Sequence, residues 1–314
     1  MLLKSATDSN NCAYPYLFTA NARTAWYKIL ESITVSKRKK LKLLLPAYIG
    51  INDKEGSGVF DSVLKSQADF VFYKVTENLQ VDVEDFYRKI NSESIDLVLI
   101  IHYFGFSRIN MDSIKSLCEK NDVILVEDCA HAFYLDDKKS KIGAYGDYSF
   151  YSLHKYLAVS TGGLLKINNN MLPIPKLSPE DKIDFSALER FASSDFKKIA
   201  EIRRDNYKSY RGKLINNDNI DVLFDLNDDD IPQTFPIFVK NGLREKLYFY
   251  LLDNNIPTVA LYYRMIPQIE PSKFELSMLI SSGILNLPVH QDTTLEDVDL
   301  VCRKINEFFG DLHD

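Results

Sequence analysis

The chain has 314 residues, of which 46% are hydrophobic and 26% are charged, as is typical of a globular protein with a large core. Its formal net charge of −6 disfavours a role in nucleic-acid binding. No stretch is long and apolar enough to cross a bilayer, and the start of the chain lacks the apolar region of a signal peptide. The spacing of Cys12, Cys118, Cys129 and Cys302 does not indicate a zinc site, so we expect free thiols, no metal and a cytoplasmic protein.

The first half of the chain alternates short apolar runs with helical patterns. The apolar runs predict strands at 41–48, 69–75, 96–101 and 123–126. The patterns between them predict helices at 57–66, 83–90 and 111–121, and Asn110 is a good N-cap for the last of these. This alternation favours the α/β class with a mixed but mainly parallel sheet, in which ligands bind beyond the carboxyl ends of the strands.

Prolines interrupt this pattern at Pro173, Pro175 and Pro179. The residues that follow predict a long charged helix at 186–214, a strand at 234–239, and helices at 243–254 and 295–309. The acidic run 225–230 is expected to be an exposed loop. We interpret this half as a smaller α+β domain, with the large domain at residues 1–190 and the small C-terminal domain at 191–314.

Four polar residues follow the central strands at a spacing that indicates a pyridoxal phosphate site. Asp128 ends one strand, His131 comes three residues later, and Ser152 and Lys155 belong to the next strand and its turn. This cofactor needs a lysine amine for a Schiff base and a carboxylate that keeps the pyridine nitrogen protonated. Each residue alone has an ordinary interpretation, such as helix capping by Asp128 or a solvated Lys155. Their order and spacing together favour the cofactor site.

A second element is the helical pattern that begins with Ala22, Arg23 and Thr24. Small and polar residues at a helix start leave backbone N–H groups free, and these groups favour an anion such as a phosphate. In isolation, an ordinary capped helix explains the same residues.

Several segments also follow one another in a familiar order: Asn21–Ala25, Leu45–Tyr48, Ile101–Gly105, Val126–Ala132, Gly143–Asp147, Ser152–Gly163 and Leu287–His290. Together they resemble the DegT/StrS family of sugar aminotransferases, which are pyridoxal phosphate enzymes of fold type I. The match at Val-Glu-Asp-Cys-Ala-His-Ala, residues 126–132, is very close.

The resemblance implies a homodimer that moves an amino group from an amino acid such as glutamate to a nucleotide-linked keto sugar, for polysaccharide biosynthesis. It implies that Lys155 forms the Schiff base with pyridoxal 5'-phosphate and moves the proton, that Asp128 pairs with the pyridine nitrogen, and that His131 lies by the ring hydroxyl. The remaining implied contacts are a ring-face position for Tyr48 and phosphate contacts from Ser152, Ala22, Arg23 and Thr24.

Three features depart from the family pattern. Phe150 stands where the family has a phosphate-binding serine, which leaves Ser149 and Ser152 as candidates. Ala22 stands where glycine is common, so we expect a cost in left-handed backbone there. The glycine- and arginine-containing loop that reaches the partner subunit in the family is not found after Gly163, and 173–181 is a poor substitute.

Two alternatives stay open. One is a dehydratase that uses the pyridoxal or pyridoxamine form of the cofactor on a similar sugar, although such relatives replace the lysine that this chain retains as Lys155. The other is a non-catalytic cofactor-binding or sensory homologue, against which the intact Asp128, His131 and Lys155 argue.

Overall fold

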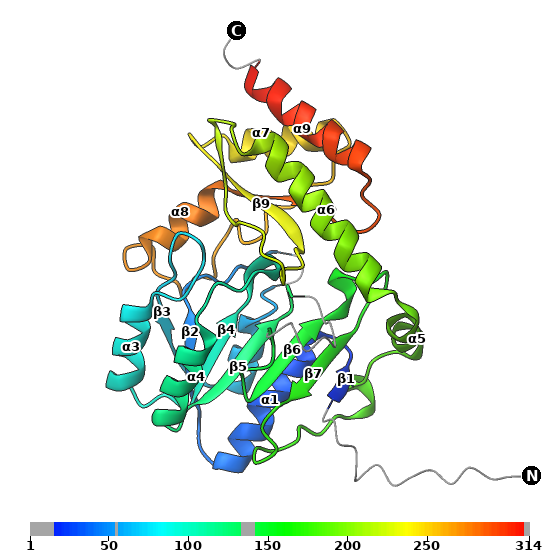
Figure 1. Ribbon diagram of the computed structural model, residues 1–314. Coiled ribbons are helices and arrows are strands. Elements are labelled where there is room, and N and C mark those ends of the chain that lie inside the picture. Colours follow the sequence, from blue (N-terminus) through cyan, green and yellow to red (C-terminus); the bar gives the residue numbers. More distant parts are fainter. Residues whose placement is uncertain (1–15, 54–55, 133–141, 311–314) are drawn as a thin grey trace, which may run out of the picture.

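Two sheets organise the chain in a computed structural model, which describes residues 16–53, 56–132 and 142–310 (Figure 1). The seven-stranded sheet has the order β1-β7-β6-β5-β4-β2-β3, and the three-stranded sheet has the order β10-β9-β8. The strands of the large sheet are β1 (Tyr16–Thr19), β2 (Lys42–Pro46), β3 (Asp69–Tyr73), β4 (Leu97–Ile101), β5 (Ile124–Cys129), β6 (Tyr148–Ser152) and β7 (Gly163–Ile167). The small sheet contains β8 (Ile220–Val222), β9 (Thr234–Val239) and β10 (Ile284–Pro288).

The large sheet is mixed but mainly parallel, as the sequence predicts. Strands β3, β2, β4, β5 and β6 run parallel, whereas β7 is antiparallel to both β6 and β1. All five residues of β4 are buried, because helices cover both faces of a parallel sheet. The crossovers that make these strands parallel bring the carboxyl ends of β4 and β5, and of β6 beside them, to one edge.

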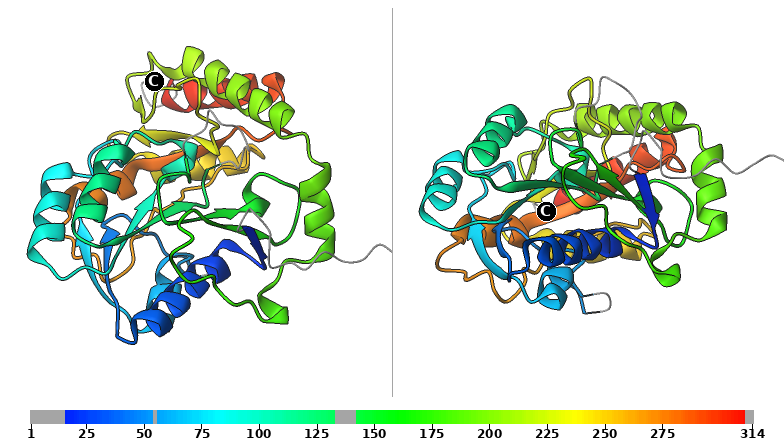
Figure 2. Two further views of the ribbon diagram at one scale, coloured as in Figure 1. Left: turned by 60° about the horizontal axis from the view of Figure 1, so that its bottom comes forward. Right: turned by 90° about the horizontal axis from the view of Figure 1, so that it is seen from below.

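Helices pack on both faces of the large sheet (Figure 2). Helix α1 (Ala22–Lys37) lies on one face, where Trp26 stacks on Phe150 of β6 with ring centroids 5.8 Å apart. Helices α3 (Val83–Ser92) and α4 (Met111–Lys120) lie on the other face. Helix α2 (Phe60–Ser66) packs against α1.

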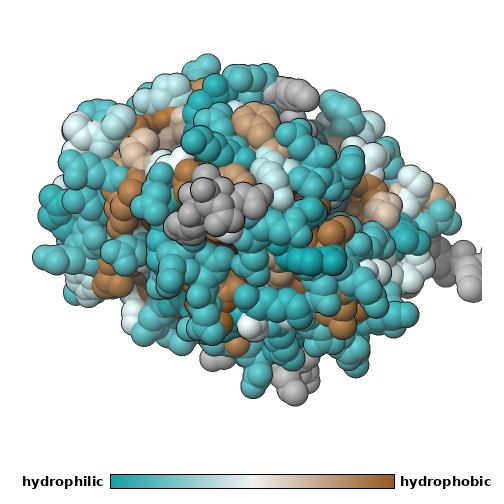
Figure 3. Space-filling model, turned by 90° about the horizontal axis from the view of Figure 1, so that it is seen from above, coloured by the Kyte–Doolittle hydropathy of each residue, from teal (hydrophilic) through white to brown (hydrophobic). Residues whose placement is uncertain are grey.

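The chain after β7 forms the small sheet and the remaining helices. Its helices are α5 (Phe185–Ser193), α6 (Phe196–Leu214), α7 (Arg244–Asp253), α8 (Glu275–Gly283) and α9 (Leu295–Gly310). Seen from above, this side of the molecule is mainly hydrophilic with scattered apolar side chains (Figure 3), as is usual for a solvent-facing surface. The expected domain boundary between residues 190 and 191 falls inside α5. Within the described ranges, none of the helices combines the length and the apolar character needed to span a membrane.

One expectation for the second half is wrong, and another holds only in part. The single helix expected at 186–214 is two helices, because Ser194 is extended and the Asp195 side chain caps α6 by accepting from the Lys198 amide at 3.1 Å. The acidic run 225–230 is not uniformly exposed. Asp230 is buried and accepts a hydrogen bond from Arg108 Nη1 at 2.8 Å, which ties this loop to the segment between β4 and α4.

The segment 173–181, which we expect to be a poor substitute for the partner-reaching loop of the family, packs against its own chain. Lys28 of α1 pairs with Asp181 at 2.9 Å, and the Ala20 amide donates to the Asp181 carbonyl at 2.7 Å. Tyr148 donates to the Pro173 carbonyl at 2.7 Å. These contacts hold one end of the segment against β6 and the other against α1 of the same chain.

Gly163 allows the start of α1 to approach β6 and β7. It pairs with Thr19 of β1 and with Ser152 of β6. A Cβ at Gly163 would lie 2.5 Å from the backbone carbon of Asn21, so only glycine fits. The backbone of α1 therefore begins directly beside the end of β6.

We predict that Gly163→Ala lowers the free energy of unfolding by about 1–3 kcal/mol, because the added methyl group forces backbone shifts. Urea unfolding measures this change. Gly212→Ala is the control, since Gly212 lies on an exposed position of α6 with no atom within 4 Å of an added Cβ. The control should be neutral or stabilising by up to about 1 kcal/mol. Equal destabilisation by both variants would refute the close-approach explanation.

Candidate active site

The pleat of β5 and β6 separates the two candidate serines. Asp128 pairs with Phe150, which faces α1, so Asp128 and Ser152 also face α1. Ser149 pairs with Glu127 on the opposite face, where its Oγ donates to the Gly143 carbonyl at 2.9 Å. Only Ser152 of the two serines therefore shares a face of the sheet with Asp128.

The start of α1 lies next to Ser152 and the turn that follows it. The Gly162 amide donates to the Ala20 carbonyl at 2.7 Å, and the Leu153 amide donates to the Gly162 carbonyl at 2.9 Å. Asn21 caps α1 by accepting from the Thr24 amide at 2.8 Å. The positive end of the helix dipole thus points toward the end of β6.

The expectation of left-handed backbone at Ala22 is wrong. Ala22 is the first helical residue of α1, and it is not among the described residues with positive φ. Because alanine suits this position, the missing glycine has no cost here. The Arg23 guanidinium is exposed and lies 3.5 Å from Asp61 of α2. The part of Arg23 that lies at the N-terminal end of α1 is therefore its backbone amide and not its guanidinium.

Asp128 is a buried carboxyl at the end of β5. One of its oxygens accepts from the Ala130 amide at 2.8 Å. Burial raises the pKa of Asp128 to about 6, although the Ala130 hydrogen bond and the positive charge of Lys155 act in the opposite direction. A cation bound against this carboxyl would stabilise its ionised form.

His131 presents a neutral imidazole to the same site. Burial, together with the nearby charge of Lys155, holds the pKa of His131 well below its usual value. Its Nδ1 accepts from the Phe104 amide at 3.4 Å, which places the ring proton on Nε2. The imidazole stacks on the Phe104 ring at 5.6 Å. His131 can therefore donate one hydrogen bond without carrying a charge.

Lys155 ends the short helix η3 (Leu153–Lys155) and is half-buried. Its ammonium acts to lower the pKa values of both Asp128 and His131, so the three residues lie within electrostatic range of one another. A carboxyl, an amine and an imidazole N–H beside a helix N-terminus are the groups that pyridoxal phosphate requires.

Buried aromatic rings lie near Asp128 and His131. Tyr48 is fully buried, and its hydroxyl has no hydrogen-bond partner within the described chain. Its ring lies 5.3 Å from that of Tyr262, which in turn lies 5.6 Å from His131. Tyr262 has a left-handed backbone with φ 61°, and burial together with the charge of Asp128 raises its pKa. The sequence does not indicate Tyr262, because nothing in its local spacing predicts contacts with residues as distant in the chain as Tyr48 and His131.

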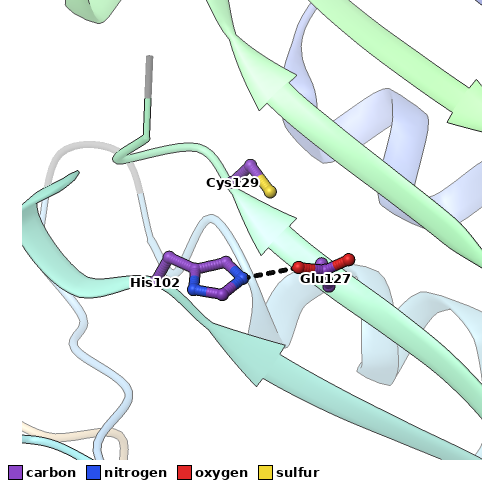
Figure 4. Close-up of side chains that lie close together, drawn as sticks. All are labelled: His102, Glu127 and Cys129. Atoms are coloured by element: carbon purple, nitrogen blue, oxygen red, sulfur yellow. Dashed lines mark hydrogen bonds and ion pairs between the residues drawn. The ribbon is translucent and has the colours of Figure 1, made fainter. Parts of the chain in front are cut away.

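A second cluster lies behind the site, on the opposite face of β5 (Figure 4). Glu127 accepts from His102 Nε2 at 2.8 Å and from the amides of Gly143, Tyr145 and Gly146 at 3.0, 2.8 and 2.6 Å. Burial acts to raise the pKa of Glu127, but His102 and these amides outweigh it and lower the pKa. Cys129 lies beside this pair. Because both carboxylate oxygens are already engaged, we interpret Glu127 as the anchor of the turn that leads into β6.

A cavity of about 350 Å³ opens beside the segment that follows Lys155. The residues that line it include Leu157, Ala158, Arg190, Lys198 and Gln291. Neither Asp128 nor His131 lines this cavity. The cavity is thus adjacent to the lysine turn rather than over the aromatic cluster.

Comparison with protein families identifies one that matches most of the chain. The model of the DegT/DnrJ/EryC1/StrS aminotransferase family matches residues 57–173 and 187–306. The GDP-perosamine synthase of Vibrio cholerae is 34% identical over 98 residues, which are 31% of this chain but only 26% of that protein. The GDP-perosamine synthase of Escherichia coli O157:H7 is 23% identical over 261 residues, covering 75% of this chain and 71% of that protein. The dTDP-4-amino-4,6-dideoxy-D-glucose transaminase of Shigella dysenteriae is 23% identical over 243 residues, covering 67% and 65%.

Solved structures show the same fold. PseC of Helicobacter pylori, an aminotransferase involved in pseudoaminic acid biosynthesis, superposes with a TM-score of 0.77 at 15% identity, covering 94% of this chain and 87% of that one. Spr1654 of Streptococcus pneumoniae, assigned as a sugar aminotransferase and solved in a PLP form, gives a TM-score of 0.75 at 14% identity, covering 92% and 85%. The architecture is therefore that of the fold type I aminotransferases.

We predict that Asp128→Asn stabilises the cofactor-free protein at pH 7.5. The pKa of Asp128 rises from 3.8 in the unfolded chain to about 6 in the folded one, so the folded protein binds its proton more tightly. As far as Asp128 is concerned, the protein is therefore most stable below about pH 4, where the carboxyl is protonated in both states. Its free energy of unfolding falls as the pH rises through about 6, because ionising the buried carboxyl has a cost. Asparagine avoids that cost, which is at most about 3 kcal/mol.

Urea unfolding of both proteins at pH 7.5 and at pH 3.5 measures the effect. The stability difference should be present at the higher pH and absent at the lower one. A variant that is less stable than the wild type at pH 7.5 would contradict this explanation, because it would show that a positive charge of the protein already compensates the Asp128 carboxylate.

Proposed function

Because the chain belongs to the DegT/DnrJ/EryC1/StrS aminotransferase family, we propose that it is a pyridoxal 5'-phosphate-dependent aminotransferase acting on a nucleotide-linked keto sugar. We propose glutamate as the amino donor. The observation that supports the cofactor most strongly is the convergence of Asp128, His131 and Lys155 at the carboxyl edge of the parallel strands. Of these three residues, Asp128 supplies a buried carboxyl whose ionised form a bound cation would stabilise.

The residues around this edge fit the parts of the cofactor. When bound, pyridoxal phosphate supplies an electron sink for the carbon that loses a proton. Asp128 would hold the pyridine nitrogen in its protonated form through a charge-assisted hydrogen bond. His131 would donate its Nε2 proton to the ring oxygen, and Tyr48 would lie near the ring face.

The phosphate would lie between β6 and α1. Ser152 is the serine that faces this side, and the first-turn amides of Ala22 and Arg23, with the Thr24 side chain, complete the set of donors. The Thr24 amide is engaged by Asn21, so the proposed contribution of Thr24 is its hydroxyl.

Lys155 would act both as the anchor of the cofactor and as the group that moves the proton. Its Nζ would take the proton from the α-carbon of the donor and return a proton to the carbon of the sugar that receives the amine. Retention of this lysine favours an aminotransferase over a dehydratase.

The relatives support the sugar nucleotide as substrate class. The proteins of Vibrio cholerae and Escherichia coli are named for a GDP-linked amino sugar, and that of Shigella dysenteriae for a dTDP-linked one. We therefore propose a place in polysaccharide biosynthesis, in the cytoplasm, with the chain acting as a homodimer.

Separate half-reactions test this function. Glutamate should convert the bound pyridoxal form of the cofactor to the pyridoxamine form, and a keto sugar on GDP, dTDP or UDP should restore the pyridoxal spectrum. Mass spectrometry should find the amino sugar nucleotide as the product. Lys155→Ala should perform neither half-reaction.

Three outcomes would change the assignment. Restoration by several 2-keto acids but by no keto sugar would indicate an amino-acid aminotransferase. A dehydrated sugar without nitrogen would indicate a dehydratase. Cofactor binding without either half-reaction would indicate a non-catalytic homologue.

A further inference from the structure

A buried arginine on α6 contacts the backbone of Lys155. The Arg203 side chain is 1% exposed, and its Nη2 donates to the Lys155 carbonyl at 3.2 Å. Nη1 donates to the carbonyls of Gln233 at 3.1 Å and Pro232 at 3.3 Å. Gln291 Oε1 accepts from Nε at 3.2 Å and from Nη2 at 3.1 Å. The guanidinium therefore joins α6, the approach to β9 and the segment after β10 to the lysine turn.

Burying the charged guanidinium of Arg203 is energetically costly, which indicates that the arginine has a role at this position. Within the described residues no carboxylate forms an ion pair with Arg203, and burial lowers its pKa to about 10, so it remains charged at neutral pH. Burying a cation is unfavourable unless many hydrogen bonds compensate. A planar guanidinium with five donors can satisfy several carbonyls in fixed directions, whereas a lysine ammonium cannot.

The same cluster also reaches His131. The Arg203 guanidinium lies over the Tyr156 ring at 4.4 Å from its centroid, and Gln291 Nε2 donates to the Tyr156 carbonyl at 2.8 Å. The Tyr156 hydroxyl donates to the His131 carbonyl. Arg203, Tyr156 and Gln291, which we call the arginine cluster, thus hold the backbone at both Lys155 and His131.

We propose that Arg203 is a positioning residue for Lys155: it fixes the backbone from which the amine extends and places a permanent positive charge behind it. This inference rests on the proposed role of Lys155. Helix η3 has only three residues, so its orientation depends on contacts from outside. The guanidinium also brings a positive charge to the backbone of Lys155, and a cation held there would disfavour a second positive charge on the lysine nitrogen.

Two substitutions separate geometry from charge. Arg203→Met removes both the donors and the charge, and Arg203→Lys retains the charge but loses the planar fork. The matched control is Arg204→Met, because Arg204 is the next residue on α6 and donates to the carbonyls of Asn227 at 2.8 Å and Asp230 at 2.6 Å, away from Lys155.

The readouts are the pH midpoint of the visible absorbance of the bound cofactor and the rate of the glutamate half-reaction. In Arg203→Met we expect the midpoint to rise by about one pH unit, since a nearby cation is lost, and the rate to fall by about 10- to 100-fold. Arg203→Lys should retain the midpoint but not the rate. Arg204→Met should match the wild type in both.

The proposal is overturned if Arg203→Met differs from the wild type only in melting temperature, or if Arg204→Met produces the same changes. Should Arg203→Met fail to fold, a wild-type rate in Arg203→Lys would overturn the proposal. A wild-type protein without a borohydride-sensitive absorbance band would instead refute the proposed function, and this inference with it.

Discussion

The burial of the Asp128 carboxyl is the constraint on which the site depends. At the end of β5 the side chain is shielded from water, and this shielding raises its pKa to about 6. An ionised carboxylate in such a place needs a cation, and the protein places the amine of Lys155 near it rather than an arginine in contact. A protonated pyridine nitrogen would satisfy the same carboxylate. The fold thus keeps an unfavourable charge site that a bound cofactor would relieve.

The two faces of the large sheet hold different groups around this carboxyl. On the face of α1, Gly163 lets the helix start approach Ser152, where we propose that the phosphate binds. On the opposite face, Glu127 gathers backbone amides of the turn before β6 and pairs with His102. The alternation of side chains along β5 therefore places Asp128 in the candidate site and Glu127 on the opposite face, where it holds the turn before β6.

Much of the fold and the centre of the site could be predicted from the sequence. The strands could be predicted because apolar runs and their spacing are local features of the sequence. Asp128 and His131 could be predicted because both lie in the short segment 126–132. The choice between Ser149 and Ser152 required the pairing of β5 with β6, since a shift of one residue reverses the face. The break between α5 and α6 depends on a cap at Asp195 that the charged pattern conceals. Tyr262 and Arg203 reach the site through tertiary packing, which spacing along the chain does not indicate.

The most direct test of the account is the site of covalent attachment of the cofactor. Purified protein loaded with pyridoxal phosphate would be reduced with borohydride, digested and mapped by mass spectrometry. The account predicts one phosphopyridoxyl group, on the peptide that contains Lys155, and bleaching of the visible absorbance on reduction. Attachment to another lysine, or no attachment while the cofactor band is present, would contradict it.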